Sequence, residues 1–135
     1  DVTSFLAKQA VKSSSKLNVK AIITDSHTGR TARYLAAFRG TSTVFAICYR
    51  ERVMRMLSLS YGVWAVHQPW NDSRRGYFYD ALNQLIKSGR ITRDNMVAYL
   101  SGSFGEGGGT TFLEINNVGK VLDANSNYTL PTFQE

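Results

Sequence analysis

The sequence has one cysteine, Cys48, and two histidines among its 135 residues. A single thiol cannot form an internal disulfide, so the cysteine content favours a reducing, cytoplasmic environment. No apolar run reaches the roughly 18 residues of a membrane span, and the first residues lack the charged-then-apolar order of a signal peptide. An HExxH motif, paired cysteines and a carboxylate cluster are also missing. We therefore expect a cytoplasmic domain without a membrane segment or a metal site.

Basic charge is present but is not concentrated in any one segment. The formal net charge is +6, and the 16 lysines and arginines are spread along the chain. The aromatic signature of RNA-binding modules does not accompany them, so we expect no nucleic-acid partner. With 43% hydrophobic residues, the chain is long enough to bury the core of one domain.

Segments with helical and strand-like patterns alternate along the chain. Apolar spacing predicts helices at 2–17, 31–39, 50–59 and 76–87, and strands at 19–24, 43–48, 62–66, 95–101 and 110–116. This alternation predicts an α/β fold with a largely parallel sheet covered on both faces, whose last strand is an antiparallel edge strand. Residues 119–135 are polar and unpatterned, so the domain is expected to span 1–118 and to be followed by a tail.

The first predicted helix has apolar residues at near-helical spacing. Its buried face is expected to contain Phe5, Leu6, Ala10, Val11 and Leu17. Thr3 or Ser4 is available as its N-cap.

Hydroxyl groups, a glycine and an arginine are concentrated between the first predicted strand and the following helix. The residues are Ser26, His27, Thr28, Gly29, Arg30 and Thr31. The start of a helix has unpaired backbone N–H groups and partial positive charge, so this stretch predicts a phosphate site. His27 could donate to the phosphate or face solvent. A plain capped turn is the alternative, because serine and threonine also cap helices.

A second loop, rich in glycine, follows the fourth predicted strand. It runs from Gly102 to Gly109 and includes Gly108. Ligands of parallel sheets bind at the carboxyl ends of the strands, so one anion could lie between both loops if their strands are neighbours. Asp25 and Glu106 would oppose an anion there unless they point away or pair with Arg30.

The spacing Ser26-x-Thr28-Gly29-x-Thr31 also fits the S/T-x-T-G-x-T loop of flavodoxin-like proteins, which holds the phosphate of FMN. An FMN-binding electron carrier is therefore the alternative function. Flavodoxins usually open with the strand before this loop and are acidic, whereas here a helix precedes the strand and the chain is basic.

A longer resemblance covers residues 1–118. The chain resembles the C-terminal α/β domain of pyruvate kinase at four places in the same order: Ala21-Ile22-Ile23 with Thr28 to Arg33, Arg55-x-Leu57-x-Leu59-x-Tyr61-Gly62-Val63, the segment from Gly89 to Ser101 with Asp94, and Gly102 with Gly108, Thr110 and Thr111.

This resemblance implies a three-layer α/β/α fold with a five-stranded, mostly parallel sheet whose last strand is antiparallel. It implies roles in allosteric regulation and tetramer assembly. The family's active site, which converts phosphoenolpyruvate and ADP to pyruvate and ATP, lies in a barrel domain absent from this sequence, as do its Mg and K ions. The chain alone is thus expected to be non-catalytic and without a cofactor. Its expected partners are a phosphorylated effector, the rest of a pyruvate kinase chain and further copies of itself.

In family members activated by sugar phosphates, the first loop holds a phosphate and the glycine-rich loop closes over the ligand. The resemblance carries these roles to Ser26–Thr31 and to the loop from Gly102 to Gly109. Here Ser103, Phe104 and Glu106 stand without the basic or tryptophan residues of members activated by fructose bisphosphate. The resemblance therefore leaves a sugar monophosphate, a nucleotide and no effector open.

Overall fold

The computed structural model describes every residue except 39, 71–74, 103–109, 111 and 127–135. Helices and strands alternate as predicted, with most boundaries within two residues of the expected ones. The elements are α1 (Val2–Lys16), β1 (Val19–Ser26), α2 (Arg30–Ala37), β2 (Thr43–Cys48), α3 (Glu51–Leu57), β3 (Val63–His67), α4 (Arg75–Lys87), β4 (Met96–Ser101), β5 (Phe112–Asn117) and α5 (Val118–Ser126).

The strands form one five-stranded sheet in the order β3-β2-β1-β4-β5. β1 pairs in parallel with both β2 and β4, and β5 pairs antiparallel with β4. This arrangement confirms the predicted sheet and its antiparallel edge strand. The chain moves from β1 outward to β3 and then returns to the other side of β1 as β4. The carboxyl ends of β1 and β4 therefore meet where the strand order reverses, which is where open α/β sheets bind ligands.

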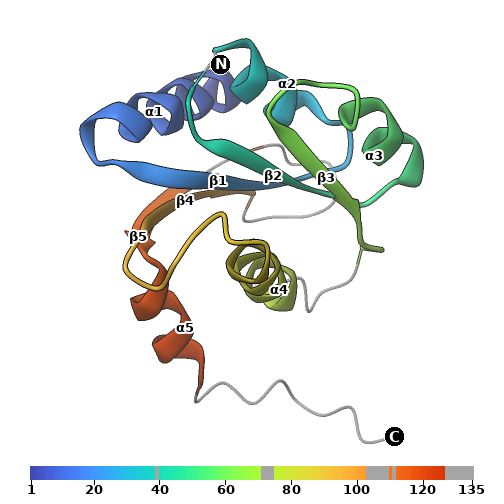
Figure 1. Cartoon of the computed structure of the whole chain (residues 1–135). Helices are drawn as coiled ribbons and strands as arrows, with labels where there is room; N and C mark the ends of the chain where they lie inside the picture. The colour runs from blue at the N-terminus through green and yellow to red at the C-terminus, as the bar shows by residue number, and fades with distance from the viewer. Residues whose placement is uncertain (39, 71–74, 103–109, 111, 127–135) are drawn as a thin grey trace, which may run out of the picture.

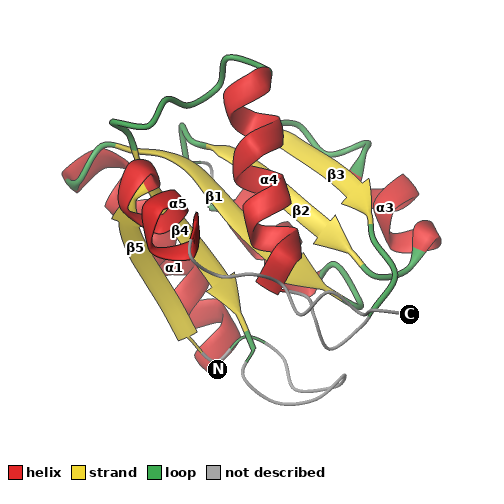
Figure 2. Cartoon of the chain, turned by 90° about the horizontal axis from the view of Figure 1, so that it is seen from below, coloured by secondary structure: helices red, strands yellow, loops and turns green. Residues whose placement is uncertain are grey.

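Helices cover both faces of the sheet, as predicted. Figure 1 shows α1, α2 and α3 above the sheet and α4 and α5 below it. Seen from below, α4 crosses β1 and β2 while α5 lies over the β4 and β5 side (Figure 2). Adjacent residues of β1 serve the two layers, because Ile22 packs in the cluster with α1 and α2 and Ile23 packs in the cluster with α4. The uninterrupted apolar run of β1 thus follows from burial on both faces.

Small residues dominate the buried face of α1, which agrees with the predicted face only in part. Ala10 is buried as predicted, and Leu6 and Val11 pack against the same core cluster. The buried positions are Thr3, Ala7, Ala10 and Ser13. By contrast, Phe5 is 61% exposed and Leu17 is 53% exposed, so their predicted burial was wrong. The N-cap is Asp1, whose carboxylate accepts a hydrogen bond from the Ser4 backbone N–H at 2.8 Å, in place of the predicted Thr3 or Ser4. Small side chains at the contact let the helix approach the sheet closely, which hydrophobic spacing does not reveal.

A helix occupies the first part of the predicted tail. In α5, Val118 and Val121 are buried and join the core cluster on the α4 side of the sheet. The Asn117 side chain accepts a hydrogen bond from the Lys120 backbone N–H at 3.1 Å and so caps the helix. The expectation of an unpatterned segment was therefore wrong for residues 119–126, while residues 127–135 lie outside the described part. No helix in the described part of the chain is long and apolar enough to cross a membrane.

Candidate functional site

The predicted phosphate-binding stretch lies at the carboxyl end of β1, in the centre of the sheet. β1 continues through Ser26, so the turn into α2 contains only His27, Thr28 and Gly29. Gly29 precedes α2 with φ of 82°, in the left-handed region that favours glycine. A buried strand and a tight turn thus fix the position of the stretch before any ligand is considered.

Hydroxyl groups within this stretch already bond to its backbone. The Ser26 hydroxyl oxygen accepts hydrogen bonds from the Gly29 N–H at 2.6 Å and the Thr28 N–H at 3.2 Å. The Thr28 hydroxyl accepts one from the Arg30 N–H at 3.3 Å. These bonds tie the turn together, as the capped-turn alternative expects, but the N-cap of α2 is Gly29, which makes no side-chain cap hydrogen bond. An anion at this site would therefore rely on the positive end of α2 and on side chains, or it would displace these bonds.

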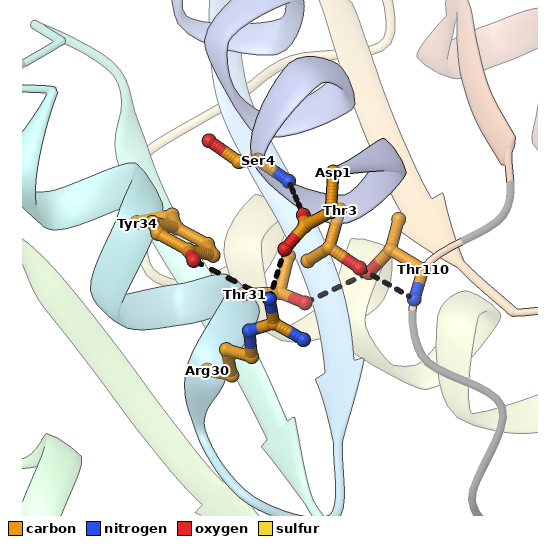
Figure 3. A network of polar contacts seen from close by, with 7 residues as sticks. All are labelled: Asp1, Thr3, Ser4, Arg30, Thr31, Tyr34 and Thr110. Carbon is orange, nitrogen blue, oxygen red and sulfur yellow. Dashed lines mark hydrogen bonds and ion pairs between the residues drawn. The ribbon is translucent and has the colours of Figure 1, made fainter.

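The guanidinium of Arg30 points away from the turn toward the start of α1 (Figure 3). It forms an ion pair and a hydrogen bond with the Asp1 carboxylate, and it lies 3.4 Å from the Tyr34 hydroxyl. The guanidinium carbon is also 5.5 Å from the centre of the Tyr34 ring. The Arg30 and Asp1 side chains are 49% and 48% exposed, so solvent reaches the pair. The sequence offered Asp25 and Glu106 as possible partners of Arg30, and Asp1 was missed.

Thr31 extends the site toward the other predicted loop. Its hydroxyl oxygen lies 2.7 Å from the Thr110 hydroxyl oxygen, and the Thr110 N–H donates to the Thr3 hydroxyl at 3.3 Å. All three threonines are buried. These contacts join the first turns of α1 and α2 to the segment that leads into β5 (Figure 3). Sequence reasoning placed Thr110 in a family pattern but found no signal for its contact with Thr31.

Both predicted loops begin at the same edge of the sheet. β1 and β4 are hydrogen-bonded neighbours, which the sequence could only assume. Gly102 directly follows β4 and lies at this edge. Gly108 and Glu106 belong to residues outside the described part, so their predicted roles are untested.

His27 packs among aromatic rings. Its ring centre lies 4.8 Å from that of Tyr49 and 4.7 Å from that of Trp70. The Tyr49 hydroxyl in turn donates a hydrogen bond to the Asp25 carboxylate. The Asp25 carboxylate is thus engaged by Tyr49 and not by Arg30, the partner that would have neutralised its charge. Tyr49 was missed because nothing in its local sequence marks the residue after β2 as a neighbour of the turn after β1.

Other chemistry is limited in the described residues. Within them, no group of three or more histidine, cysteine, aspartate or glutamate side chains could hold a metal ion. Cys48 is buried at the end of β2, and burial raises the pKa of its thiol to about 12. A thiol that stays protonated is a poor nucleophile, so Cys48 has the properties of a packing residue.

Comparison with known proteins decides the family. Residues 4–116 match the family described as pyruvate kinase, alpha/beta domain. The chain belongs to this family. A pyruvate kinase of Borreliella burgdorferi is 34% identical over 117 residues, covering 84% of this chain and 24% of the relative. One of Bacillus licheniformis is 26% identical over 121 residues, covering 90% of this chain and 21% of the relative.

Solved structures agree on the fold of this pyruvate kinase domain. The structure named Cryptosporidium parvum pyruvate kinase in complex with ADP has a TM-score of 0.79 and 24% identity, covering 87% of this chain and 24% of that one. The chain thus spans about a quarter or less of the relatives it matches. The predicted α/β/α fold and the resemblance to the C-terminal domain of pyruvate kinase are confirmed, and the flavodoxin-like alternative is not favoured.

Proposed function

We propose that this domain is the regulatory part of a cytoplasmic pyruvate kinase and binds a phosphorylated small-molecule effector at Ser26–Thr31. The observation that carries the proposal is the adjacency of β1 and β4, which brings the starts of both predicted loops to the point where the strand order reverses. The complete protein would convert phosphoenolpyruvate and ADP to pyruvate and ATP. That chemistry and its metal ions belong to the rest of the chain, and the domain alone is non-catalytic.

Three features support an anion at this position. The first is the positive end of α2, which begins at Arg30 directly after the turn. The second is the exposed Thr28 side chain, which can donate a hydrogen bond from its hydroxyl. The third is the half-exposed guanidinium of Arg30, which would suit the oxygen atoms of a phosphate once it leaves its ion pair with Asp1. The glycine-rich loop that begins at Gly102 would close over the remainder of the ligand, a sugar monophosphate or a nucleotide.

The domain is also proposed to contribute to contacts between subunits of a tetramer. Val2 and Phe5 are 60% and 61% exposed and lie three residues apart, on one face of α1. Exposed apolar neighbours of this kind suit an interface between copies. We expect sedimentation velocity of the chain to detect self-association that Phe5→Glu weakens. The measurement is repeated at concentrations that rise in 100-fold steps to millimolar. A wild-type chain that stays monomeric at every concentration would contradict this role.

The effector proposal is tested by nuclear magnetic resonance. Glucose 6-phosphate, AMP and fructose 1,6-bisphosphate are titrated separately while the amide resonances of Thr28, Gly29 and Thr31 are followed. We expect at least one compound to shift these resonances in the wild type and to shift them much less in Arg30→Gln. Unchanged spectra at millimolar ligand would remove the site. A coupled assay with phosphoenolpyruvate and ADP completes the test, because turnover by the chain alone would contradict a non-catalytic domain.

A further inference from the structure

One carboxylate serves two elements next to the proposed effector site. An oxygen of Asp1 accepts the Ser4 N–H at 2.8 Å and so caps α1. The other oxygen pairs with the guanidinium of Arg30, the first residue of α2. The carboxylate of Asp1, the N-cap of α1, is therefore paired with the Arg30 guanidinium, which is the cation that a phosphate at Ser26–Thr31 would need (Figure 3).

Arg30 is also the only lysine or arginine in the stretch from Ser26 to Thr31. The backbone N–H groups of Thr28, Gly29 and Arg30 are bonded to side-chain hydroxyls. An arriving phosphate consequently meets a site in which these three N–H groups are already bonded and the Arg30 guanidinium is already paired with a carboxylate. It must compete with Asp1 for Arg30.

The position of Asp1 is fixed by buried contacts. Thr3, two residues after Asp1, accepts the Thr110 N–H, and Thr110 in turn meets the Thr31 hydroxyl. Because these threonines are buried, the first turn of α1 is held against the first turn of α2. The fold thus holds the Asp1 carboxylate close to Arg30, so its competition with a ligand is intramolecular.

We propose that Asp1 is a built-in competitor that lowers the affinity of the domain for phosphorylated effectors by neutralising Arg30. The proposal rests on the proposed function and specifies how that site is regulated. Effector binding draws Arg30 away from Asp1 but leaves the Ser4 cap and the buried threonine contacts intact. The ion pair between Asp1 and α2 is then lost while α1 stays folded against α2. Thermodynamic linkage requires the converse as well. If effector binding weakens the Asp1–Arg30 pair, then a change that separates Asp1 from Arg30 strengthens effector binding by the factor by which the effector weakens the pair.

The test measures affinity for inorganic phosphate and for glucose 6-phosphate in Asp1→Asn. Asparagine is as good an N-cap as aspartate, so this change removes the charge and keeps the cap. Because an exposed ion pair has a modest free energy, we expect the dissociation constant to fall about two- to five-fold in low salt. The effect should shrink at high ionic strength, where exposed charges are screened.

A matched control separates this effect from net charge. Asp123 forms an exposed ion pair with Arg93 at 2.6 Å, so Asp123→Asn also removes one negative charge and breaks one aspartate–arginine pair. We expect Asp123→Asn to bind phosphate as the wild type does. A second charge-free capping variant, Asp1→Ser, should reproduce the tighter binding of Asp1→Asn.

The possible outcomes distinguish the two proposals. If Arg30→Gln weakens binding while Asp1→Asn, Asp1→Ser and Asp123→Asn all match the wild type, the competitor role is overturned and the effector site stands. If neither the wild type nor the Asp1 variants bind either compound, the effector site itself fails and the competitor role fails with it. Tighter binding that is confined to both Asp1 variants supports the competitor role.

Discussion

The hydroxyl oxygens of Thr31 and Thr110 lie 2.7 Å apart, although 79 residues separate them in the sequence. Both side chains are at least 95% buried. The contact connects the first turn of α2 to the segment that leads into the antiparallel edge strand β5. Since the Thr110 N–H also donates to Thr3, three elements meet at one small polar cluster beneath the proposed effector site.

The hydroxyl pair predicts a non-additive effect on stability. Thr31→Val should lower the free energy of unfolding by about 1–3 kcal/mol, because it leaves the buried Thr110 hydroxyl without its partner. Thr110→Val should do the same in reverse. The double variant should lose less than the sum of the two, since removing both hydroxyls leaves no orphaned group. Urea unfolding of all four proteins measures this coupling.

A control for the cycle is Thr43→Val on the half-buried first residue of β2. We expect it to combine additively with Thr31→Val. Additive losses for Thr31 and Thr110 would show that the two hydroxyls do not stabilise each other.

The crowded surroundings of Gly29 lead us to expect that Gly29→Ala destabilises the chain more than Gly89→Ala does. Gly29→Ala places a side chain at φ of 82°, and the new Cβ would lie 3.1 Å from both Met56 Cε and Val53 Cγ1. Gly89 has nearly the same backbone, with φ of 79°, but its Cβ would meet nothing within 4 Å. We expect Gly89→Ala to cost about 1 kcal/mol from backbone strain alone, and Gly29→Ala to cost about 1 kcal/mol more from crowding.

Thermal and urea unfolding of the two glycine variants measure the comparison. The difference between them reports how tightly α3 packs against the turn after β1. Equal losses would indicate that α3 moves aside without cost.

The burial of Val121 indicates that α5 is part of the core. Its side chain is 5% exposed, whereas that of Val2 on α1 is 60% exposed. Val121→Ala should lower the free energy of unfolding by about 2 kcal/mol, from lost burial and the cavity left behind. Val2→Ala makes the same change on an exposed helix surface and should have little effect at concentrations where the chain is monomeric. A stability of Val121→Ala equal to that of Val2→Ala would contradict the packing of α5.

The sheet was predictable because its strands carry strong local patterns. The run Ala21-Ile22-Ile23 has no polar residue, and burial on both faces of a central parallel strand accounts for that. The face of α1 was predictable from periodicity only in part: Ala10 is buried as predicted, but Ala7 is buried too and the larger Phe5 faces solvent. α5 was missed because Val118 and Val121 form a short apolar pattern within a polar segment.

The residues of the candidate site were found more readily than their contacts. Ser26 and Gly29 lie where the turn chemistry indicated, because their roles depend on neighbours three residues apart. Arg30 pairs with Asp1 and His27 packs against Trp70, and these partners are distant in the sequence. Such contacts depend on how α1, α2 and the segment after β3 are arranged around the turn after β1, which one sequence does not specify locally.

Cys48 predicts a loss of stability at alkaline pH. Burial raises the pKa of its thiol to about 12 in the folded chain, whereas an exposed thiol in the unfolded chain titrates at about 9. Between these values the unfolded state binds fewer protons than the folded state, so stability falls as pH rises. The thiol should cost about 1.4 kcal/mol at pH 10 relative to pH 7.5. Cys48→Ala removes this dependence, while tyrosines and lysines titrate in both proteins. Urea unfolding at the two pH values should therefore show a larger loss of unfolding free energy at pH 10 for the wild type than for Cys48→Ala. Equal losses would mean that the thiol ionises as easily in the folded chain as in the unfolded one.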